Sequence, residues 1–110
     1  MVKITFYKDT TGRLTGFKMK GHANFSNKGG DIVCSAVSML SQTTLLGLAE
    51  IVNLKMPYTM RDGYLCCELP KIISEEQSLM AKALLETMRL GIKNIVKKYN
   101  RYVDIDEEEV

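Results

Sequence analysis

The segment VKITFYK, at residues 2–8, alternates between apolar and polar side chains. This period of two predicts a strand that buries one face and exposes the other. The turn-forming sequence DTTG follows at residues 9–12, and a second extended run covers residues 14–20. Together they predict an N-terminal β-hairpin.

A long apolar segment at residues 31–52 predicts an α-helix, because its valines, leucines and isoleucines recur at helical spacing. Asp31 is a favourable N-cap residue, so we place the start of the helix there. A second apolar set makes the helix apolar on more than one side, which is typical of a central helix or of a subunit contact. This second set is Ile32, Ala36, Met39 and Leu46.

The second half of the chain repeats the order of the first. Residues 57–61 and 64–69 flank Asp62-Gly63, the strongest short hairpin signal in the chain. The sequence SEEQ at residues 74–77 is a capping box that opens a second long helix. The order ββαββα predicts an α+β fold, a two-layer sandwich of two long helices on a mostly antiparallel sheet.

Charge is unevenly distributed along the 110 residues, which include 15 basic and 13 acidic side chains. Five carboxylates lie in residues 104–109. We interpret residues 1–103 as a single domain and residues 104–110 as a frayed acidic C-terminal tail. The basic remainder is compatible with RNA affinity, but arginine-rich runs and aromatics interleaved with basic residues are missing. We therefore expect no direct nucleic-acid binding.

The same composition bears on location and cofactors. No stretch reaches the roughly 18 consecutive apolar residues of a membrane helix, and the N-terminus lacks the apolar core of a signal peptide. We expect a cytoplasmic protein with reduced thiols and no membrane partner. Cys66 and Cys67 point to opposite faces of a predicted strand and lack the spacing of a zinc site, so we interpret them as packing residues. We expect neither a metal nor a cofactor.

Cys34 and His22 are the candidates for chemistry. Cys34 would lie in the first turn of the predicted helix, where the helix terminus favours an anion such as a thiolate, although the Asp31 carboxylate opposes it. Backbone amides of that turn are candidates for an oxyanion hole. His22, the single histidine, begins a polar glycine-rich loop and can take the thiol proton. A lone cysteine is more often a small packing residue, so residue type alone leaves both interpretations open.

Two stretches together form a more specific pattern. The sequence GHA at residues 21–23 and GGDIVCSAVS at residues 29–38 resemble the GHA…GxDIVCAAVS signature of the ribosomal-processing cysteine protease (Prp) family. The spacing from His22 to Cys34 matches, and the departure is Ser35, where alanine is usual. Chain length and element order agree with the family along nearly the whole chain.

The resemblance implies an α/β sandwich, commonly a homodimer, in a bacterial peptidase. Such proteins remove a short N-terminal extension from the large-subunit ribosomal protein numbered twenty-seven, so the expected partner is this N-extended precursor. His22 and Cys34 occupy the catalytic positions of the family, and Asp31 and Ser38 occupy its other recurrent polar positions. With no third catalytic residue evident in the sequence, we expect a Cys–His dyad.

The remaining candidates support this pair. Ser38 lies one helical turn beyond Cys34, where it contacts substrate, orients the dyad or simply allows close packing. Asp31 caps the helix, orients His22, or does both. We expect the loop at residues 24–30 to gate substrate access, because its glycines permit large backbone changes. The supporting or substrate-binding candidates are therefore Asp31, Ser38, Gly21, Gly29 and Gly30.

Two alternatives belong to other functional classes. In a non-catalytic ribosome-associated binding module, Cys34 and His22 would be structural, and Cys34→Ala would leave the activity intact. In a thiol redox protein, Cys34 would be oxidised to a sulfenic acid and resolved by Cys66 or Cys67. The lack of a C-x-x-C motif weighs against the second alternative.

Overall fold

The computed structural model describes residues 1–22 and 28–110, with the backbone alone for residues 28–31. The strands are β1 (Val2–Lys8), β2 (Leu14–Lys20), β3 (Tyr58–Arg61), β4 (Tyr64–Glu68) and β5 (Val103–Glu109). The helices are α1 (Lys28–Leu46), its π-helical continuation η1 (Gly47–Ile51), and α2 (Glu75–Tyr99). The predicted α+β sandwich is confirmed, with a further strand, in the order ββαββαβ.

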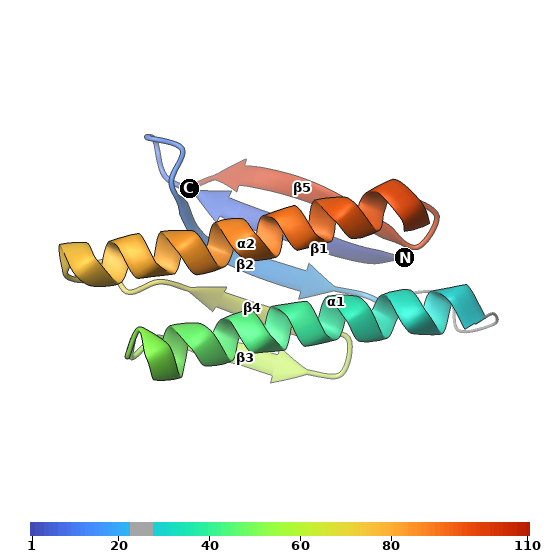
Figure 1. Cartoon of the computed structure of the whole chain (residues 1–110), viewed down its shortest axis with the longest axis horizontal. Coiled ribbons are helices and arrows are strands. Elements are labelled where there is room, and N and C mark those ends of the chain that lie inside the picture. The colour runs from blue at the N-terminus through green and yellow to red at the C-terminus, as the bar shows by residue number, and fades with distance from the viewer. Residues whose placement is uncertain (23–27) are drawn as a thin grey trace.

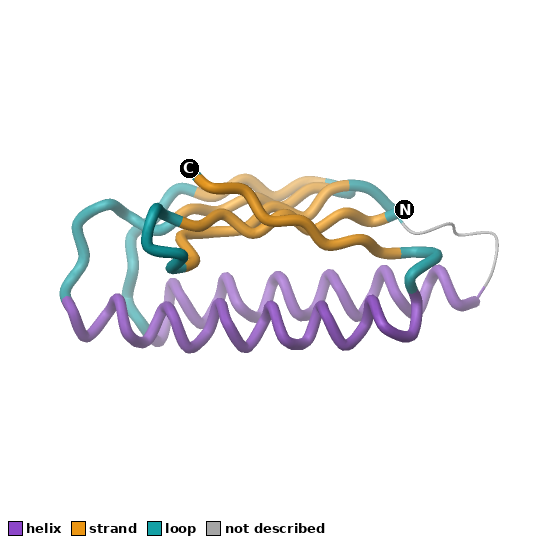
Figure 2. The backbone as a smooth tube through the Cα atoms, turned by 90° about the horizontal axis from the view of Figure 1, so that it is seen from above, coloured by secondary structure: helices purple, strands orange, loops and turns teal. Residues whose placement is uncertain are grey.

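The sheet has the strand order β3-β4-β2-β1-β5, and both helices cover one of its faces (Figures 1 and 2). Pairing is antiparallel except between β1 and β5, which run parallel. Both predicted hairpins are confirmed. Val2, Ile4 and Phe6 of β1 are buried beneath the helices, as their alternation predicts.

The acidic C-terminal segment is a strand, so the prediction of a frayed tail at residues 104–110 is wrong. β5 lies beside β1 at the edge of the sheet (Figure 1), and its first residue, Val103, is buried. Glu107 lies 3.5 Å from Nζ of Lys8 on β1 and 3.1 Å from Nη1 of Arg89 on α2. The carboxylates of this segment would repel one another in isolation. Pairing with β1 and basic partners from distant segments stabilise them as an ordered strand.

The first helix begins at Lys28, so the predicted start at Asp31 is wrong by one turn. Gly29 and Gly30 are poor helix formers, which is why the sequence favours a later start. The backbone is nevertheless helical through both, since propensity is a weak preference that the rest of the fold overrides. Asp31 therefore lies inside the helix rather than at its N-cap, and Cys34 lies in the second turn.

The body of α1 with η1 is apolar on two sides, as predicted. The buried set includes Val33, Val37, Leu45 and Leu48. The exposed set includes Ile32, Met39 and Leu46, with exposed fractions of 59%, 65% and 57%. With a mean hydropathy of 1.6 over Ile32–Ile51, the helix is long and apolar enough to cross a membrane. A helix packed in a protein core passes the same test, so this is weak support for a membrane span.

The second helix begins at its predicted capping box. The Ser74 hydroxyl accepts a hydrogen bond from the Gln77 backbone at 3.0 Å, and the Gln77 side chain accepts one from the Ser74 backbone at 3.1 Å. The Gln77 side-chain amide also donates to the carbonyl of Val52 at 3.2 Å. This bond joins the start of α2 to the end of η1, and the two helices lie side by side over the sheet (Figure 1).

Candidate active site

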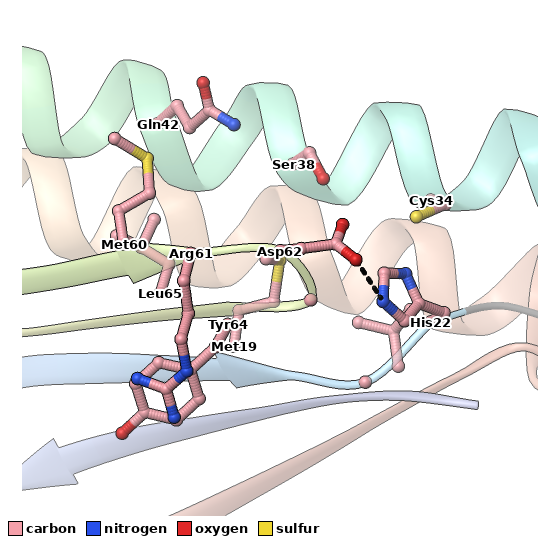
Figure 3. A pocket seen from close by; sticks show the side chains of 13 residues that line it. Met19, His22, Cys34, Ser38, Gln42, Met60, Arg61, Asp62, Tyr64 and Leu65 are labelled. Carbon is pink, nitrogen blue, oxygen red and sulfur yellow. Dashed lines mark ion pairs between the residues drawn. The ribbon is translucent and has the colours of Figure 1, made fainter.

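A pocket of about 280 Å³ opens where the end of β2, helix α1 and the β3–β4 hairpin meet (Figure 3). Cys34 and His22 both line it, although they come from different elements. The volume lies at the low end for ligand sites, which suits one or two side chains of an extended peptide better than a large cofactor. Its lining is Val2, Met19, Gly21, His22, Cys34, Ser38, Gln42, Met60, Arg61, Asp62, Gly63, Tyr64 and Leu65.

One row along α1 supplies the helical wall. Cys34, Ser38 and Gln42 are spaced four residues apart, so successive turns present them on the same side of the helix. Cys34 and Ser38 are half-buried and Gln42 is exposed. In Figure 3 the three side chains follow one another along the ribbon, with the sulfur of Cys34 closest to His22.

Cys34 lies one turn further into the helix than the sequence predicts. Helix-terminal electrostatics fade within the first turn, and backbone N–H groups beyond that turn bond to carbonyls within the helix. Because Cys34 lies in the second turn, the expectation of a first-turn thiolate with free amides for an oxyanion hole is wrong.

His22 follows directly after β2 and is held there by backbone contacts. Gly21 has a φ of +100°, which lets the chain turn at the end of the strand, and a Cβ at this position would clash with the Met1 carbonyl. The Met1 amino group donates a hydrogen bond to the His22 carbonyl at 2.8 Å, and the Gly21 amide donates to the Gly63 carbonyl at 2.9 Å. The candidate Gly21 thus lines the pocket, and a larger residue at this position would clash with the Met1 carbonyl.

The β3–β4 turn forms the wall opposite the helix. Gly63 has a φ of +68°, and a Cβ there would overlap Nε2 of His22, so the imidazole lies directly against the turn. The Asp62 carboxylate lies 3.6 Å from the same Nε2 atom. The side chain of Asp62 is 98% exposed, whereas that of His22 is 40% exposed. The imidazole therefore has a carboxylate on one side and Cys34 on the other (Figure 3).

The two other cysteines lie on opposite faces of β4, as predicted. Cys67 faces the core, and burial raises the pKa of its thiol to about 12, so it remains protonated at neutral pH. Cys66 is on the outer face and half-buried. Cys66 raises the pKa of Tyr64, mainly through a charge interaction and to a smaller extent through a hydrogen bond. Cys66 is separated by the sheet from the helix that carries Cys34, which is unfavourable for a disulfide between them.

Three supporting candidates stay untested. The backbone of Gly29, Gly30 and Asp31 is helical, and their contribution to the site remains a prediction. Of the proposed gating loop at residues 24–30, residues 24–27 lie outside the described residues, so the gating role stays a prediction. Residues 28–30 belong to α1.

Sequence reasoning missed the hairpin wall of the pocket. Asp62 and Gly63 carry a strong turn signal, which predicted the hairpin but not its contact with His22. Gln42 was also missed, although its position two turns beyond Cys34, in the row with Ser38, is a signal visible in the sequence.

Comparison with known proteins relates this chain to a family. Residues 1–104 match the family model described as Cysteine protease Prp. The chain is 25% identical over 101 residues to the Ribosomal processing cysteine protease Prp of Bacillus subtilis (strain 168), covering 90% of each protein.

Solved structures show the same fold. SMU.848 from Streptococcus mutans has a TM-score of 0.85 and 28% identity, covering 100% of this chain and 96% of that one. The essential ribosomal processing protease Prp from S. aureus, in complex with a covalently linked product peptide, has a TM-score of 0.83 and 21% identity, covering 98% of this chain and 100% of that one. At this identity the second likeness concerns the fold alone.

Proposed function

The chain belongs to the Prp family of cysteine proteases, and on this premise we propose both its substrate and its catalytic residues. It removes the N-terminal extension from the precursor of the large-subunit ribosomal protein numbered twenty-seven. Cys34 is the nucleophile and His22 the base. The observation that carries the proposal is that these two residues, from separate elements, line one pocket.

The proposed substrate is supported by the relatives. The Bacillus subtilis protein is named for ribosomal processing, and structures of the S. aureus protein contain a substrate peptide or a product peptide. A peptide substrate suits the present pocket, since Met19, Met60 and Leu65 give part of its lining an apolar character. A cytoplasmic location in bacteria belongs to the same proposal, because ribosomal proteins are processed where ribosomes assemble.

The reaction follows the general course of thiol proteases. His22 accepts the proton of the Cys34 thiol, and the sulfur attacks the scissile carbonyl carbon. The resulting imidazolium donates that proton to the leaving amine as the carbon–nitrogen bond breaks, leaving a thioester on Cys34. His22 then takes a proton from water, whose oxygen attacks the thioester, and the thiol is regenerated as the acid product leaves. Ser38 lies one turn along α1 from the sulfur and is proposed to contact the substrate.

Oligomeric state is a separate part of the proposal. The exposed apolar set on α1, which includes Ile32, Met39 and Leu46, supports a homodimer formed through this helix. A second copy of the chain would cover these side chains, which are exposed to water in the single chain.

The test is cleavage of the N-extended precursor, followed by mass spectrometry. Wild type, Cys34→Ala and His22→Ala are compared with Cys66→Ala, which removes a thiol from the opposite side of the sheet. We expect one specific cut, made by wild type and Cys66→Ala and lost in the other two variants. An intact precursor with folded wild-type protein would favour the ribosome-associated binding module instead.

The redox alternative has a test of its own. Peroxide treatment of a thiol redox protein would join Cys34 to Cys66 or Cys67 in a disulfide. Burial of Cys67, with its raised pKa, and the place of Cys66 on the outer face both oppose this pairing. We expect peroxide to produce no intramolecular disulfide by non-reducing mass analysis.

A further inference from the structure

The turn between β3 and β4 packs against His22, yet the proposed dyad makes no use of it. Gly63 lies so close to the imidazole that a Cβ would overlap Nε2, and its carbonyl accepts a hydrogen bond from Gly21 at 2.9 Å. The turn is therefore fixed to the chain beside the imidazole. Asp62, the other residue of the turn, has its carboxylate 3.6 Å from Nε2.

We propose that Asp62 is a positioning residue for His22, a role that rests on the proposed dyad. Its carboxylate faces Nε2, which leaves Nδ1 on the side of the ring toward Cys34 (Figure 3). Nδ1 then accepts the thiol proton, and the Nε2 proton stays on the ring, directed at Asp62. The carboxylate takes no proton itself. It favours the ring orientation needed for transfer and stabilises the imidazolium that forms.

The distance indicates when this contact acts. At 3.6 Å the two atoms are too far apart for a hydrogen bond, and the carboxylate is 98% exposed. An ion pair so open to water contributes little to stability. Catalytic contacts are often long in the free enzyme and shorten when substrate binds. A peptide in the pocket would also exclude water, which strengthens the attraction between carboxylate and imidazolium.

The neighbouring cation is directed elsewhere. Arg61 precedes Asp62 in the chain, but its guanidinium lies over the ring of Tyr64, 4.0 Å from the ring centroid. In Figure 3 the Arg61 and Asp62 side chains point in different directions, and only Asp62 points toward His22. The aromatic contact thus holds the guanidinium away from the carboxylate, which keeps its charge for the imidazole.

Three variants separate positioning from the stability of the turn. Asp62→Ala removes the carboxylate. Asp62→Asn keeps an acceptor oxygen and forms Asn-Gly, a dipeptide equally suited to a hairpin turn. Asp9→Ala is the matched control, because Asp9 stabilises the β1–β2 turn by accepting backbone hydrogen bonds from Thr11 and Arg13 at 2.9 and 3.1 Å, away from His22.

Two readouts are measured on the full chain. The first is kcat and KM for the N-extended precursor. The second, which needs no substrate, is the rate of iodoacetamide alkylation at Cys34, followed by peptide mass spectrometry with Cys66 as internal reference. We expect Asp62→Ala to lower kcat on the order of tenfold with little change in KM, and to slow alkylation of Cys34 but not of Cys66. Asp62→Asn, which keeps the turn but loses the charge that stabilises the imidazolium, should lower kcat as Asp62→Ala does, whereas Asp9→Ala should retain all of it.

The outcomes distinguish this inference from the proposed function. A folded wild type that leaves the precursor intact would contradict the proposed function, while alkylation of Cys34 would still report whether Asp62 acts through His22. Wild-type kcat together with wild-type alkylation in Asp62→Ala would overturn the positioning role. A raised KM with unchanged kcat would overturn it as well, because Asp62 would then be a substrate contact.

Discussion

Replacing Gly63 by alanine tests whether the β3–β4 turn holds the imidazole of His22, the proposed base, in place. Gly63 has a φ of +68°, and a Cβ added there would overlap Nε2 of His22. Either the imidazole or the turn must move to admit the methyl group. Both movements displace His22 relative to Cys34, and proton transfer between them depends on their geometry.

Gly63→Ala should have two effects, a loss of stability from backbone strain and a loss of cleavage rate from displacement of His22, and a matched variant separates them. A non-glycine residue in the left-handed region costs roughly 1–2 kcal/mol, and each kcal/mol lowers the Tm of a domain near this size by about 4 °C. Displacement of a catalytic group by about 1 Å costs on the order of 100-fold in rate. Gly12, in the β1–β2 turn, has a φ of +88° and open space around its Cβ position. Gly12→Ala therefore carries the backbone strain without the clash.

The assay compares wild type, Gly12→Ala and Gly63→Ala by thermal unfolding and by steady-state cleavage of the N-extended precursor. We expect both variants to lose several degrees of Tm, and Gly63→Ala alone to lose activity, on the order of 100-fold. Equal activity of the two variants, within about twofold, would refute the reasoning that contact with the turn positions His22.

Three further predictions concern the rest of the molecule. Because burial raises the pKa of the Cys67 thiol from 9.0 to about 12, the unfolded chain loses this proton at lower pH than the folded one. The free energy of unfolding should therefore fall as the pH rises above about 9, less steeply in Cys67→Ala, as measured by urea unfolding. Met39→Glu should make the proposed dimer monomeric in analytical ultracentrifugation, whereas Ile72→Glu, at a loop position, should not; an unchanged sedimentation coefficient would place the contact elsewhere. Glu107→Ala removes the carboxylate that pairs with Lys8 and Arg89 and should lower stability by up to about 1 kcal/mol in thermal unfolding, with Glu109→Ala, at the exposed end of the strand, as control.

Local patterns were sufficient for most of the fold. The alternation in residues 2–8, the turn at Asp62-Gly63 and the capping box at Ser74 each act over a few residues, and each predicted its element correctly. The strand at residues 103–109 was missed because its ordering depends on pairing with β1 and on basic residues from two other elements. A short acidic segment considered alone has no means of offsetting its own repulsion.

The site divides in the same way. The spacing of His22, Cys34 and Ser38 could be recognised in the sequence, and the structure brings all three to one pocket. The place of Asp62 beside the imidazole could not be predicted, because the two residues are 40 positions apart in the chain and the pairing of β2 with β4 brings them together.

The sequence by itself determined which residues are candidates for a role in the site: a single histidine, a cysteine on an apolar helix, and turn residues suited to tight backbone geometry. The tertiary structure alone decided how they meet. It placed Cys34 in the second turn of α1, beyond the reach of the helix terminus, and set a carboxylate and a glycine against the other side of His22. The physical reason is that propensity and periodicity act between near neighbours, whereas the environment of a catalytic group is set by contacts between strands and helices far apart in the chain.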